Sequence, residues 1–398
     1  MTHAMTERRT DAPTASPNIV HAALAVGGFA IGTTEFATMS LLPYFATDLH
    51  IDAPTAGHVI SAYALGVVVG APLIAVMAAK MARRTLLIGL MLLFALGNGL
   101  SGIAPTYGWM LAFRFLSGLP HGAYFGIASL VAASLVPPGK RSQAVARVML
   151  GLTVATIIGV PVANAIGRAI GWRWCFGLVT ALALLTALLV ALFAPRDNAP
   201  AGNSALAELA ALRRLQVWLA LGTGAIGFGG LFAVYTYLAD TMHAVTHASA
   251  GAVPFALAAF GVGATIGSLV VPRFADRALK PTAAGLLIWS AIVLSLWPLA
   301  AQHLWSVIVE LFAIGLGTAL GIVLQTRLMD VADHAQGLAA ALNHSAFNTA
   351  NALGPALGGA AIAAGYGWTS TGWVGAMLAI GGLVIWIVSI VTSRATQR

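Results

Sequence analysis

The chain has 398 residues, of which 59% are hydrophobic and only 8% are charged. A soluble globular domain is about 45–50% apolar and about 25% charged, so this composition excludes a soluble fold and requires lipid around most of the surface. The formal net charge of +8 could suit nucleic acid. The Lys and Arg residues, however, lie in short breaks between apolar runs and form no basic stripe, so we expect no nucleic-acid partner.

Apolar runs of about 20 residues can cross a bilayer as helices, and the sequence contains twelve such runs. We predict spans at residues 19–45, 55–79, 85–104, 108–134, 144–168, 173–194, 216–239, 251–272, 282–300, 304–326, 337–364 and 370–391. Continuous runs such as 181–193 favour helices over the alternating strands of a membrane barrel. The prediction is therefore an all-α membrane protein with twelve transmembrane helices.

The positive charges are unevenly distributed between the loops. When the loops are assigned alternately to the two sides, nearly all Lys and Arg residues fall on the side of the N-terminus. Arg168 and Arg173 fall on the other side, and Arg114 falls inside a span. Because positive charge collects in cytoplasmic loops, we expect both termini to be cytoplasmic.

The longest polar break follows the sixth span and divides the chain into halves. We predict an N-terminal tail at 1–18, a six-helix bundle at 19–194, a cytoplasmic linker at 195–215 and a second six-helix bundle with a short tail at 216–398.

The two halves also resemble internal repeats, which are frequent in transporters. One cluster repeats at an offset of 194, pairing Pro161, Gly171 and Trp174 with Pro355, Gly365 and Trp368. Another repeats at an offset of 197, pairing Gly70, Lys80 and Arg83 with Gly267, Arg277 and Lys280. We therefore expect the two bundles to be pseudo-symmetric.

Three charged residues lie within predicted spans, where an ionised group costs at least about 2.5–3.5 kcal/mol and is a functional candidate by default. Glu35 lies just past the middle of the first span, beside Thr33 and Thr34. A carboxyl group at that depth is a candidate for binding a proton or a substrate. The alternative is a buried Glu that only pins helices together.

Arg114 lies about two turns into the fourth span and should share a layer with Glu35. Arg keeps its proton, so it needs a carboxylate, a backbone carbonyl or water. It could tune the proton affinity of Glu35 by moving toward or away from it. Equally, it could bond permanently to the backbone of a neighbouring helix.

Further polar residues form a candidate substrate cavity. Glu310 lies at a similar depth in the tenth span, either in the cavity or merely solvated at the membrane interface. The eleventh span carries Asn343, His344, Asn348 and Asn351; the last three share one helical face. That face could line a water-filled cavity, for which Thr34 is a further candidate, or it could make interhelical hydrogen bonds. His121, in the fourth span, is interpreted as a packing residue rather than a proton relay.

Motifs for other activities are missing from the sequence. It has no phosphate-binding loop, no His-Glu-x-x-His zinc pattern and no Gly-x-Ser-x-Gly nucleophile elbow. We therefore expect no cofactor, no metal and no enzymatic activity. The remote alternative is a membrane enzyme using Asp48, His50 and Asp52, although these residues resemble an ordinary solvated loop.

With these features in place, the chain resembles the major facilitator superfamily, in particular its twelve-span drug:proton antiporter branch and the bacterial arabinose-type and chloramphenicol-type exporters. The resemblance rests on Gly32-Thr-Thr-Glu-Phe36 in the first span and Arg114-Phe-Leu-Ser-Gly-Leu-Pro-His-Gly122 in the fourth. It implies two bundles that rock around a central cavity, a bacterial inner membrane and proton coupling through Glu35 and Arg114.

Two further motifs match the family in part. Gly159, Pro161 and Gly167 resemble the antiporter motif of the fifth span, although Asn164 and Ala165 replace its paired glycines. The resemblance assigns gating to cytoplasmic loops that carry Lys80, Arg83, Arg84, Asp276 and Arg277. The loop after the second span lacks the family's Asp; the Asp-Arg pair occurs instead after the eighth span, as Asp276-Arg277.

The sequence therefore predicts a secondary transporter that acts by alternating access as a monomer in the lipid bilayer. Proton-coupled efflux of small organic molecules such as drugs or sugars is the leading hypothesis. The alternative is a proton-coupled importer or facilitator of a small metabolite. Substrate, direction and stoichiometry are left open by the sequence.

Overall fold

A computed structural model of the chain describes residues 16–51, 53–196, 208–332 and 335–395. All regular secondary structure in these residues is helical. Most of the predicted tail at 1–18, and residues 197–207 of the predicted linker, lie outside the described residues.

The first half of the chain folds into helices that agree with the first six predicted spans. They are α1 (Pro17–Asp48), α2 (Ala53–Met77), α3 (Arg83–Gly102), α4 (Tyr107–Ser134), α5 (Arg141–Val154), α6 (Val160–Ala169) and α7 (Trp172–Phe193). A π-helical turn, η2 (Ala155–Gly159), joins α5 to α6, so that these elements cross as one span. We call α1–α7 the N-bundle.

The second half folds into helices that we call the C-bundle. They are α9 (Leu215–Gly227), α10 (Gly229–Thr236), α11 (Leu238–Ala244), α12 (Val253–Ala300), α13 (Leu304–Gly317), α14 (Leu320–Val331), α15 (Gln336–Ala361) and α16 (Ser370–Ala395). A second π-helical turn, η5 (Ile362–Tyr366), follows α15.

In the described part of the chain, ten helical stretches are long and apolar enough to cross a membrane. One of them is α12, whose 48 residues would extend roughly 72 Å if straight, more than twice the hydrocarbon thickness of about 30 Å. The backbone of α12 is non-helical at Ala278 (φ −151°, ψ 71°), which lies between two predicted spans. With α12 counted as two spans and α15 included, the number agrees with the twelve predicted from the sequence.

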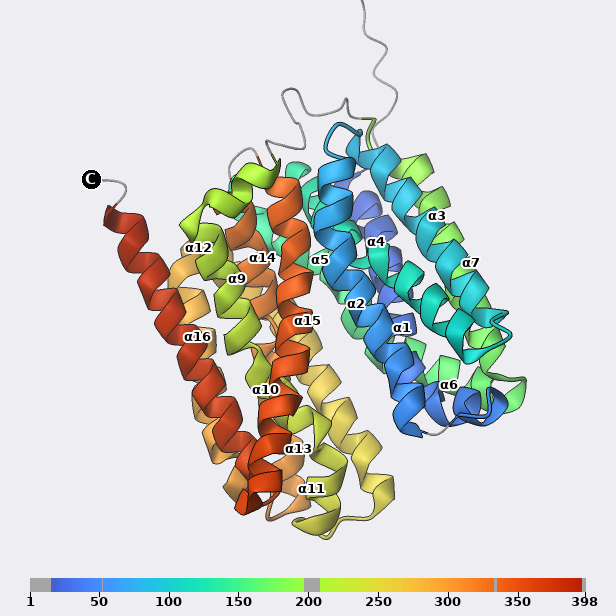
Figure 1. Cartoon of the computed structure of the whole chain (residues 1–398). Coiled ribbons are helices and arrows are strands. Elements are labelled where there is room, and N and C mark those ends of the chain that lie inside the picture. Colours follow the sequence, from blue (N-terminus) through green and yellow to red (C-terminus); the bar gives the residue numbers. More distant parts are fainter. Residues whose placement is uncertain (1–15, 52, 197–207, 333–334, 396–398) are drawn as a thin grey trace, which may run out of the picture.

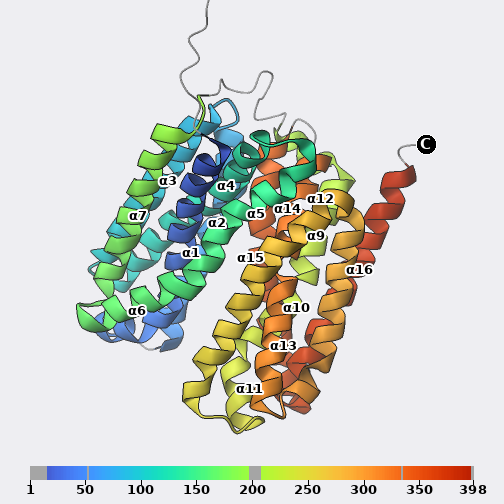
Figure 2. The same cartoon turned by 180° about the vertical axis from the view of Figure 1, so that it is seen from behind.

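The two bundles lie side by side, converging at one end and separating toward the other (Figures 1 and 2). The convergent end, which we call the basic end, carries Arg83 and Arg84 at the start of α3, Arg141 at the start of α5 and Arg277 beside the kink in α12. The far end, which carries Asp48 and Arg173, is called the opposite end. Both α1 and α9 begin at the basic end, and α16 ends there.

Pseudo-symmetry between the bundles is visible in matched glycine contacts. In the N-bundle, Gly66 of α2 packs on the carbonyl of Phe115, and Gly118 of α4 packs on the carbonyl of Tyr63. In the C-bundle the same contacts recur 197 residues later, with Gly263 on the carbonyl of Phe312 and Gly315 on that of Phe260. A side chain at any of these glycines would collide with backbone, so the small residues permit these close helix crossings.

The turns before α7 and after α15 repeat as well. Gly171 has φ +107° and Gly365 has φ +88°, a backbone region that favours glycine. Both positions belong to the cluster that repeats at an offset of 194. The internal repeat detected in the sequence therefore corresponds to repeated backbone geometry.

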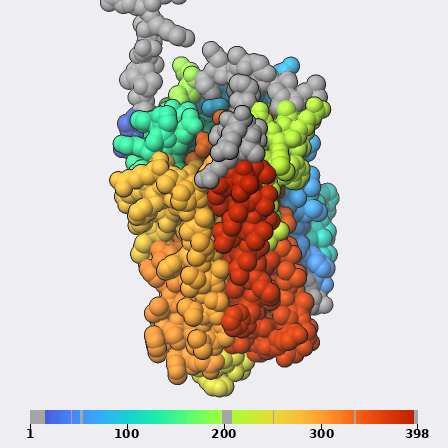
Figure 3. Space-filling view, turned by 90° about the vertical axis from the view of Figure 1, so that its left-hand side faces the viewer, coloured from blue at the N-terminus to red at the C-terminus, as the bar shows by residue number. Residues whose placement is uncertain are grey.

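The outer surface is apolar, as a lipid-facing surface requires. Figure 3 shows the side of the C-bundle on which α16 (red) runs beside α12 (orange). Large side chains are exposed along α16, including Met377 (63%), Val384 (55%) and Val391 (62%). Such a continuous apolar face would favour aggregation in water, which agrees with a membrane location.

Candidate functional site

A buried polar cluster joins α1, α3 and α4 at the centre of the N-bundle. Arg114 of α4 is only 1% exposed, and its Nη1 donates to Oγ1 of Thr34 at 3.1 Å. The Thr34 hydroxyl donates in turn to Oδ1 of Asn98 at 2.7 Å, and Nδ2 of Asn98 donates to the carbonyl of Phe94. The structure thus brings together Thr34 and Arg114, which were predicted, and adds Asn98, which sequence reasoning missed.

The guanidinium of Arg114 is stabilised mainly by aromatic faces. Its Cζ lies 4.4 Å from the ring centroid of Tyr63 and 5.5 Å from that of Phe176, an arrangement that favours a cation. Its Nε is buried and makes no hydrogen bond in the described part of the chain. Arg114 is therefore neither bonded to a backbone carbonyl nor paired with a carboxylate here, and it retains donor capacity for a negatively charged partner.

Glu35 lies one residue after Thr34 on α1 and within electrostatic reach of both Arg114 and Tyr63. Its side chain is partly exposed, while Thr33 and Thr34 are fully buried. Met39, one helical turn further toward the opposite end, is 41% exposed. Glu35 thus lies between the buried Thr33 and Thr34 and a more exposed part of α1.

The antiporter-like motif packs against the helix that carries Glu35. A side chain at Gly159 would collide with Oγ1 of Thr33, and one at Gly32 would lie 2.9 Å from Cβ of Ala155. Pro161 follows the π-helical turn η2, while Gly167 packs on Leu41 and near Cys175. The motif therefore sets the distance between α1 and the fifth span; π-helical turns are frequent at functional sites.

The polar residues predicted on the eleventh span occupy α15 but have different surroundings. Asn343 and His344 are buried at 1% and 5% exposure, whereas Asn348 and Asn351 are partly exposed. His344 packs against α4, and Asn348 follows it by four residues on the same face. The face that contacts the N-bundle near the basic end therefore continues as Asn348 and Asn351 toward the opposite end.

Glu310 lies apart from this cluster. It is 8% exposed on α13, and its Oε1 is buried without a hydrogen-bond partner in the described residues. By the 197-residue repeat, Leu311 rather than Glu310 corresponds to Arg114. Because α13 packs on α12 within the C-bundle, the structure does not bring Glu310 to Glu35, Arg114 or the polar face of α15.

Close contact between the bundles occurs where α4 crosses α15. A side chain at Gly126 would lie 2.7 Å from the backbone nitrogen of Ala341, and one at Gly122 would lie 3.1 Å from its carbonyl oxygen. Further along α15, Gly354 and Gly358 pack on α10 of their own bundle. The bundles are therefore in contact through the part of α15 nearer the basic end.

Replacing Gly126 by Val should force the bundles apart at this crossing, because the obstructing atoms belong to backbone and cannot rotate away. We expect the Gly126→Val variant to fold but to favour a conformation open at the basic end. Spin labels at Met81 and Leu215, exposed on the two bundles at that end, would report a longer distance. The matched control is Gly89→Val, since a side chain at Gly89 would meet nothing within 4 Å.

Carboxylates cap helices of the fifth and eleventh spans at the basic end. Asp276 of α12 accepts from the backbone N–H of Ser142 at 2.7 Å and of Gln143 at 3.3 Å, and from Nε2 of Gln143 at 2.9 Å. These N–H groups belong to the first turn of α5, where helices attract negative charge. The predicted gating residue Asp276 thus links the C-bundle to the N-bundle.

Glu208 makes the equivalent cap on α15 and was missed by sequence reasoning. It is 3% exposed, and its Oε2 accepts from the backbone N–H of Leu338 at 2.8 Å. The position in the first half that corresponds to Asp276 at the 197-residue offset is Ala79, in the loop that lacks the expected acid. Arg83 of that loop lies within electrostatic reach of Glu208. Glu208, a carboxylate near the end of the linker, thus caps α15 in the way that Asp276 caps α5.

The other predicted gating residues are distributed around these caps. Arg84 donates from Nη2 to the carbonyl of Ala191 within the N-bundle, and Lys80 and Arg277 are exposed. A further link between the bundles joins Arg141 Nη1 to Asp330 Oδ1 at 3.6 Å. Because both side chains are more than a third exposed, this ion pair contributes little to stability.

The cap on α15 should depend on pH. Burial raises the pKa of Glu208 above its ordinary value of 4.5, against the opposing effects of the α15 N–H groups and Arg83. A carboxyl group whose pKa is raised in the folded contact stabilises that contact most at low pH. The stabilisation is lost as pH rises through the raised pKa. We expect Glu208→Gln to flatten the pH dependence of the Met81–Leu215 label distance. An unchanged slope in the Gln variant would contradict this role for Glu208.

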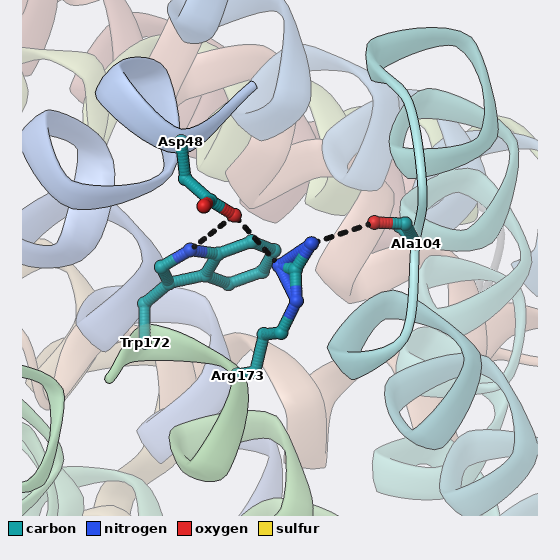
Figure 4. A network of polar contacts seen from close by, with 4 residues as sticks. All are labelled: Asp48, Ala104, Trp172 and Arg173. Carbon is teal, nitrogen blue, oxygen red and sulfur yellow. Dashed lines mark hydrogen bonds and ion pairs between the residues drawn. The ribbon is translucent and has the colours of Figure 1, made fainter. Parts of the chain in front are cut away.

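At the opposite end, a network ties three segments of the N-bundle together (Figure 4). Asp48 Oδ2 accepts from Arg173 Nη1 at 2.9 Å and from Trp172 Nε1 at 3.2 Å, and Arg173 Nη2 donates to the carbonyl of Ala104 at 3.1 Å. Asp48 is therefore engaged in joining helix ends, which weakens its candidacy as a catalytic group. Asp52, named with it in the enzyme hypothesis, lies outside the described residues.

Two packed helical bundles, one of which holds a buried charged cluster among apolar spans, are typical of membrane transporters. Comparison with known proteins agrees. The family model described as Major Facilitator Superfamily matches residues 24–244 and 217–398. The inner membrane transport protein YdhP of Escherichia coli is 42% identical over 92% of this chain and 94% of its own length. A chloramphenicol resistance protein of Streptomyces lividans is 34% identical, covering 91% and 92%.

A solved structure supports the same fold. The fucose:proton symporter of E. coli superposes with a TM-score of 0.73 at 15% identity, covering 94% of this chain and 99% of that chain. The chain belongs to the major facilitator superfamily. It is therefore a multi-pass membrane protein that transports rather than an enzyme, as the sequence predicted.

Proposed function

We propose that this protein is a proton-coupled exporter of small organic molecules in a bacterial inner membrane, with its basic end in the cytoplasm. The observation that carries the proposal is the partly exposed Glu35 beside an Arg114 that has no carboxylate partner in the described residues. Such a carboxyl group can be occupied by a proton or can pair with Arg114. Exchange between these states supplies a coupling step.

Alternating access follows from where the bundles touch. The Asp276 hydrogen bonds and the α4–α15 crossing hold them together at the basic end, and the helices separate toward the opposite end (Figure 1). We assign this conformation to the state in which the cytoplasmic side is closed. Breaking these contacts would expose Glu35 to the cytoplasm, and re-forming them would return it to the outside.

The substrate class is inferred from the polar residues of α15 that we assign to the substrate cavity. Asn348 and Asn351 on α15 offer amide donors and acceptors without charge, and the relative in S. lividans is named for chloramphenicol resistance. These features favour neutral or weakly charged, partly apolar compounds that make a few hydrogen bonds. Glu310 stays a secondary candidate for substrate binding, because it lies apart from Asn348 and Asn351.

The test is transport by the purified protein in liposomes with an imposed pH gradient. Candidate compounds are chosen by growth of an overexpressing strain against a panel of antibiotics, dyes and sugars. A compound that accumulates against its own gradient, in the direction opposite to proton flow, supports antiport. Movement in the same direction as protons would establish the importer alternative, and transport indifferent to the gradient would establish a facilitator.

A further inference from the structure

A chain of buried side chains leads from the charged cluster to the contact between the bundles. Tyr63 of α2, whose ring lies under Arg114, contacts Nδ1 of His121 through its hydroxyl at 2.9 Å. Nε2 of His121, on α4, lies 3.3 Å from Nδ1 of His344, on α15. The three residues are 3%, 2% and 5% exposed. The last of these hydrogen bonds crosses from the N-bundle to the C-bundle.

The chemistry of this chain allows two arrangements of protons. In one, the Tyr63 hydroxyl donates to His121, and His121 donates to His344. In the other, His344 donates to His121, and His121 donates to the Tyr63 oxygen. A neutral imidazole has one N–H and one acceptor nitrogen, so both rings reverse together. The state of Tyr63 therefore fixes which bundle supplies the proton of the His121–His344 bond.

Packing holds the two imidazoles in position. His344 stacks on Phe125 with centroids 4.5 Å apart and an interplanar angle of 13°, and His121 lies 5.1 Å from His344. Nε2 of His344 is buried without a hydrogen-bond partner in the described residues. If both imidazoles were protonated, the two N–H groups between them would face each other and two cations would be in contact. The His121–His344 hydrogen bond therefore requires at least one neutral ring.

The charged and titratable groups around the pair are few. Tyr63 faces it from α2, with Arg114 of α4 behind that ring and Glu35 of α1 within electrostatic reach of both. On α15 the flanking residues are Asn343, Phe347 and Asn348, none of which titrates. Among the residues that the structure describes, the ionisable connection from the pair to the coupling centre therefore runs through Tyr63.

We propose that His121 and His344 are positioning residues for transport, forming a hydrogen-bonded latch between the bundles that Tyr63 ties to the state of Glu35 and Arg114. The proposal rests on the proton-coupled function proposed above. When a proton or substrate at Glu35 shifts Arg114, the cation over the Tyr63 ring moves, and the hydroxyl changes as donor or acceptor. The Tyr63–His121 hydrogen bond then breaks, without any proton leaving the chain of three residues, and His121 no longer holds His344. Occupancy at the centre is thereby transmitted to closure at the basic end.

The test compares two replacements at His344 in a Cys175→Ser background, which removes the only cysteine of the chain. Gln can keep one hydrogen bond but cannot be protonated, and Phe keeps the stack on Phe125 but makes no hydrogen bond. Spin labels at Thr106 and Gln302, both exposed at the opposite end, report the distance between the bundles as pH is varied.

The His344→Phe variant should reduce the population closed at the basic end by roughly three- to tenfold, the effect of one buried hydrogen bond. The His344→Gln variant should keep closure but show a flatter pH profile, and substrate counterflow should persist in both. Wild-type distances and pH profile in the Phe variant would show that the imidazoles only pack, and would overturn the latch. Tyr63→Phe should resemble the His344→Phe variant, because it removes the hydroxyl that holds His121 and keeps the ring under Arg114.

The same measurements separate this inference from the proposed function. If wild-type transport is independent of the proton gradient, proton coupling itself fails. If wild-type transport is coupled and the His344 variants match it in rate, distance and pH profile, only the latch fails.

Discussion

The Glu35→Gln variant is expected to insert and fold normally but to lose proton-driven transport completely, down to the level of liposomes without protein. Glutamine is nearly isosteric with glutamate and leaves the Thr34–Arg114 hydrogen bond in place. It cannot exchange a proton, so the coupling step has no carrier. Substrate counterflow, which needs no net proton movement, should continue in the variant.

The measurement is transport under an imposed pH gradient, with counterflow assayed in the same preparation. Glu35→Asp should keep part of the coupled rate, since it retains a titratable group at a shorter reach. Asp240→Asn is the matched control, because Asp240 is an exposed carboxylate on α11, away from the cluster. Coupled transport at the wild-type rate in Glu35→Gln would remove Glu35 from the mechanism and leave Glu310 as the carboxylate to examine.

The Asp276→Ala variant should shift the protein strongly toward the conformation open at the basic end. The substitution removes the three hydrogen bonds that Asp276 accepts from Ser142 and Gln143 and a negative charge at the start of α5. Loss of a helix cap costs about 0.5–2 kcal/mol, so the closed population should fall by roughly three- to thirtyfold. The Met81–Leu215 label distance would lengthen accordingly.

Asp276→Asn should fall between wild type and Ala, because an amide oxygen can still accept one N–H but lacks the charge that favours the helix N-terminus. Here too Asp240→Asn serves as control. Should Asp276→Ala leave the label distance unchanged, the closed conformation would have to depend on the α4–α15 crossing and on the Glu208 cap instead. The Gly126→Val and Glu208→Gln variants would then decide between those two.

The spans, the repeat and the position of the charged cluster could be predicted from the sequence because each leaves a local signal. Length and hydropathy gave the helices, and the offset of 197 anticipated glycine contacts that recur between α2–α4 and α12–α13. Glu35 and Arg114 were visible because a charge inside an apolar run is costly. These signals can be read along the chain itself, from local hydropathy and charge or from similarity between its two halves, which is why one sequence was enough.

The contacts between segments far apart in the chain could not be predicted in the same way. His121 was interpreted as a packing residue, because nothing near it in the chain shows that His344, 223 residues away, lies against it. Glu208 was overlooked because its partner is the backbone of α15, and a backbone N–H leaves no mark in the sequence. The one available signal was the missing acid after the second span, which indicates that a carboxylate must come from elsewhere.

The Asp48–Trp172–Arg173 network of Figure 4 has a mechanical consequence. It connects the end of α1 to the start of α7 and to the segment before α4, and so resists independent spreading of these helix ends. We expect these three helix ends to move as a unit when that end opens or closes. Because both side chains of the Asp48–Arg173 ion pair are more than a third exposed, that coupling depends on all three hydrogen bonds together rather than on the ion pair alone.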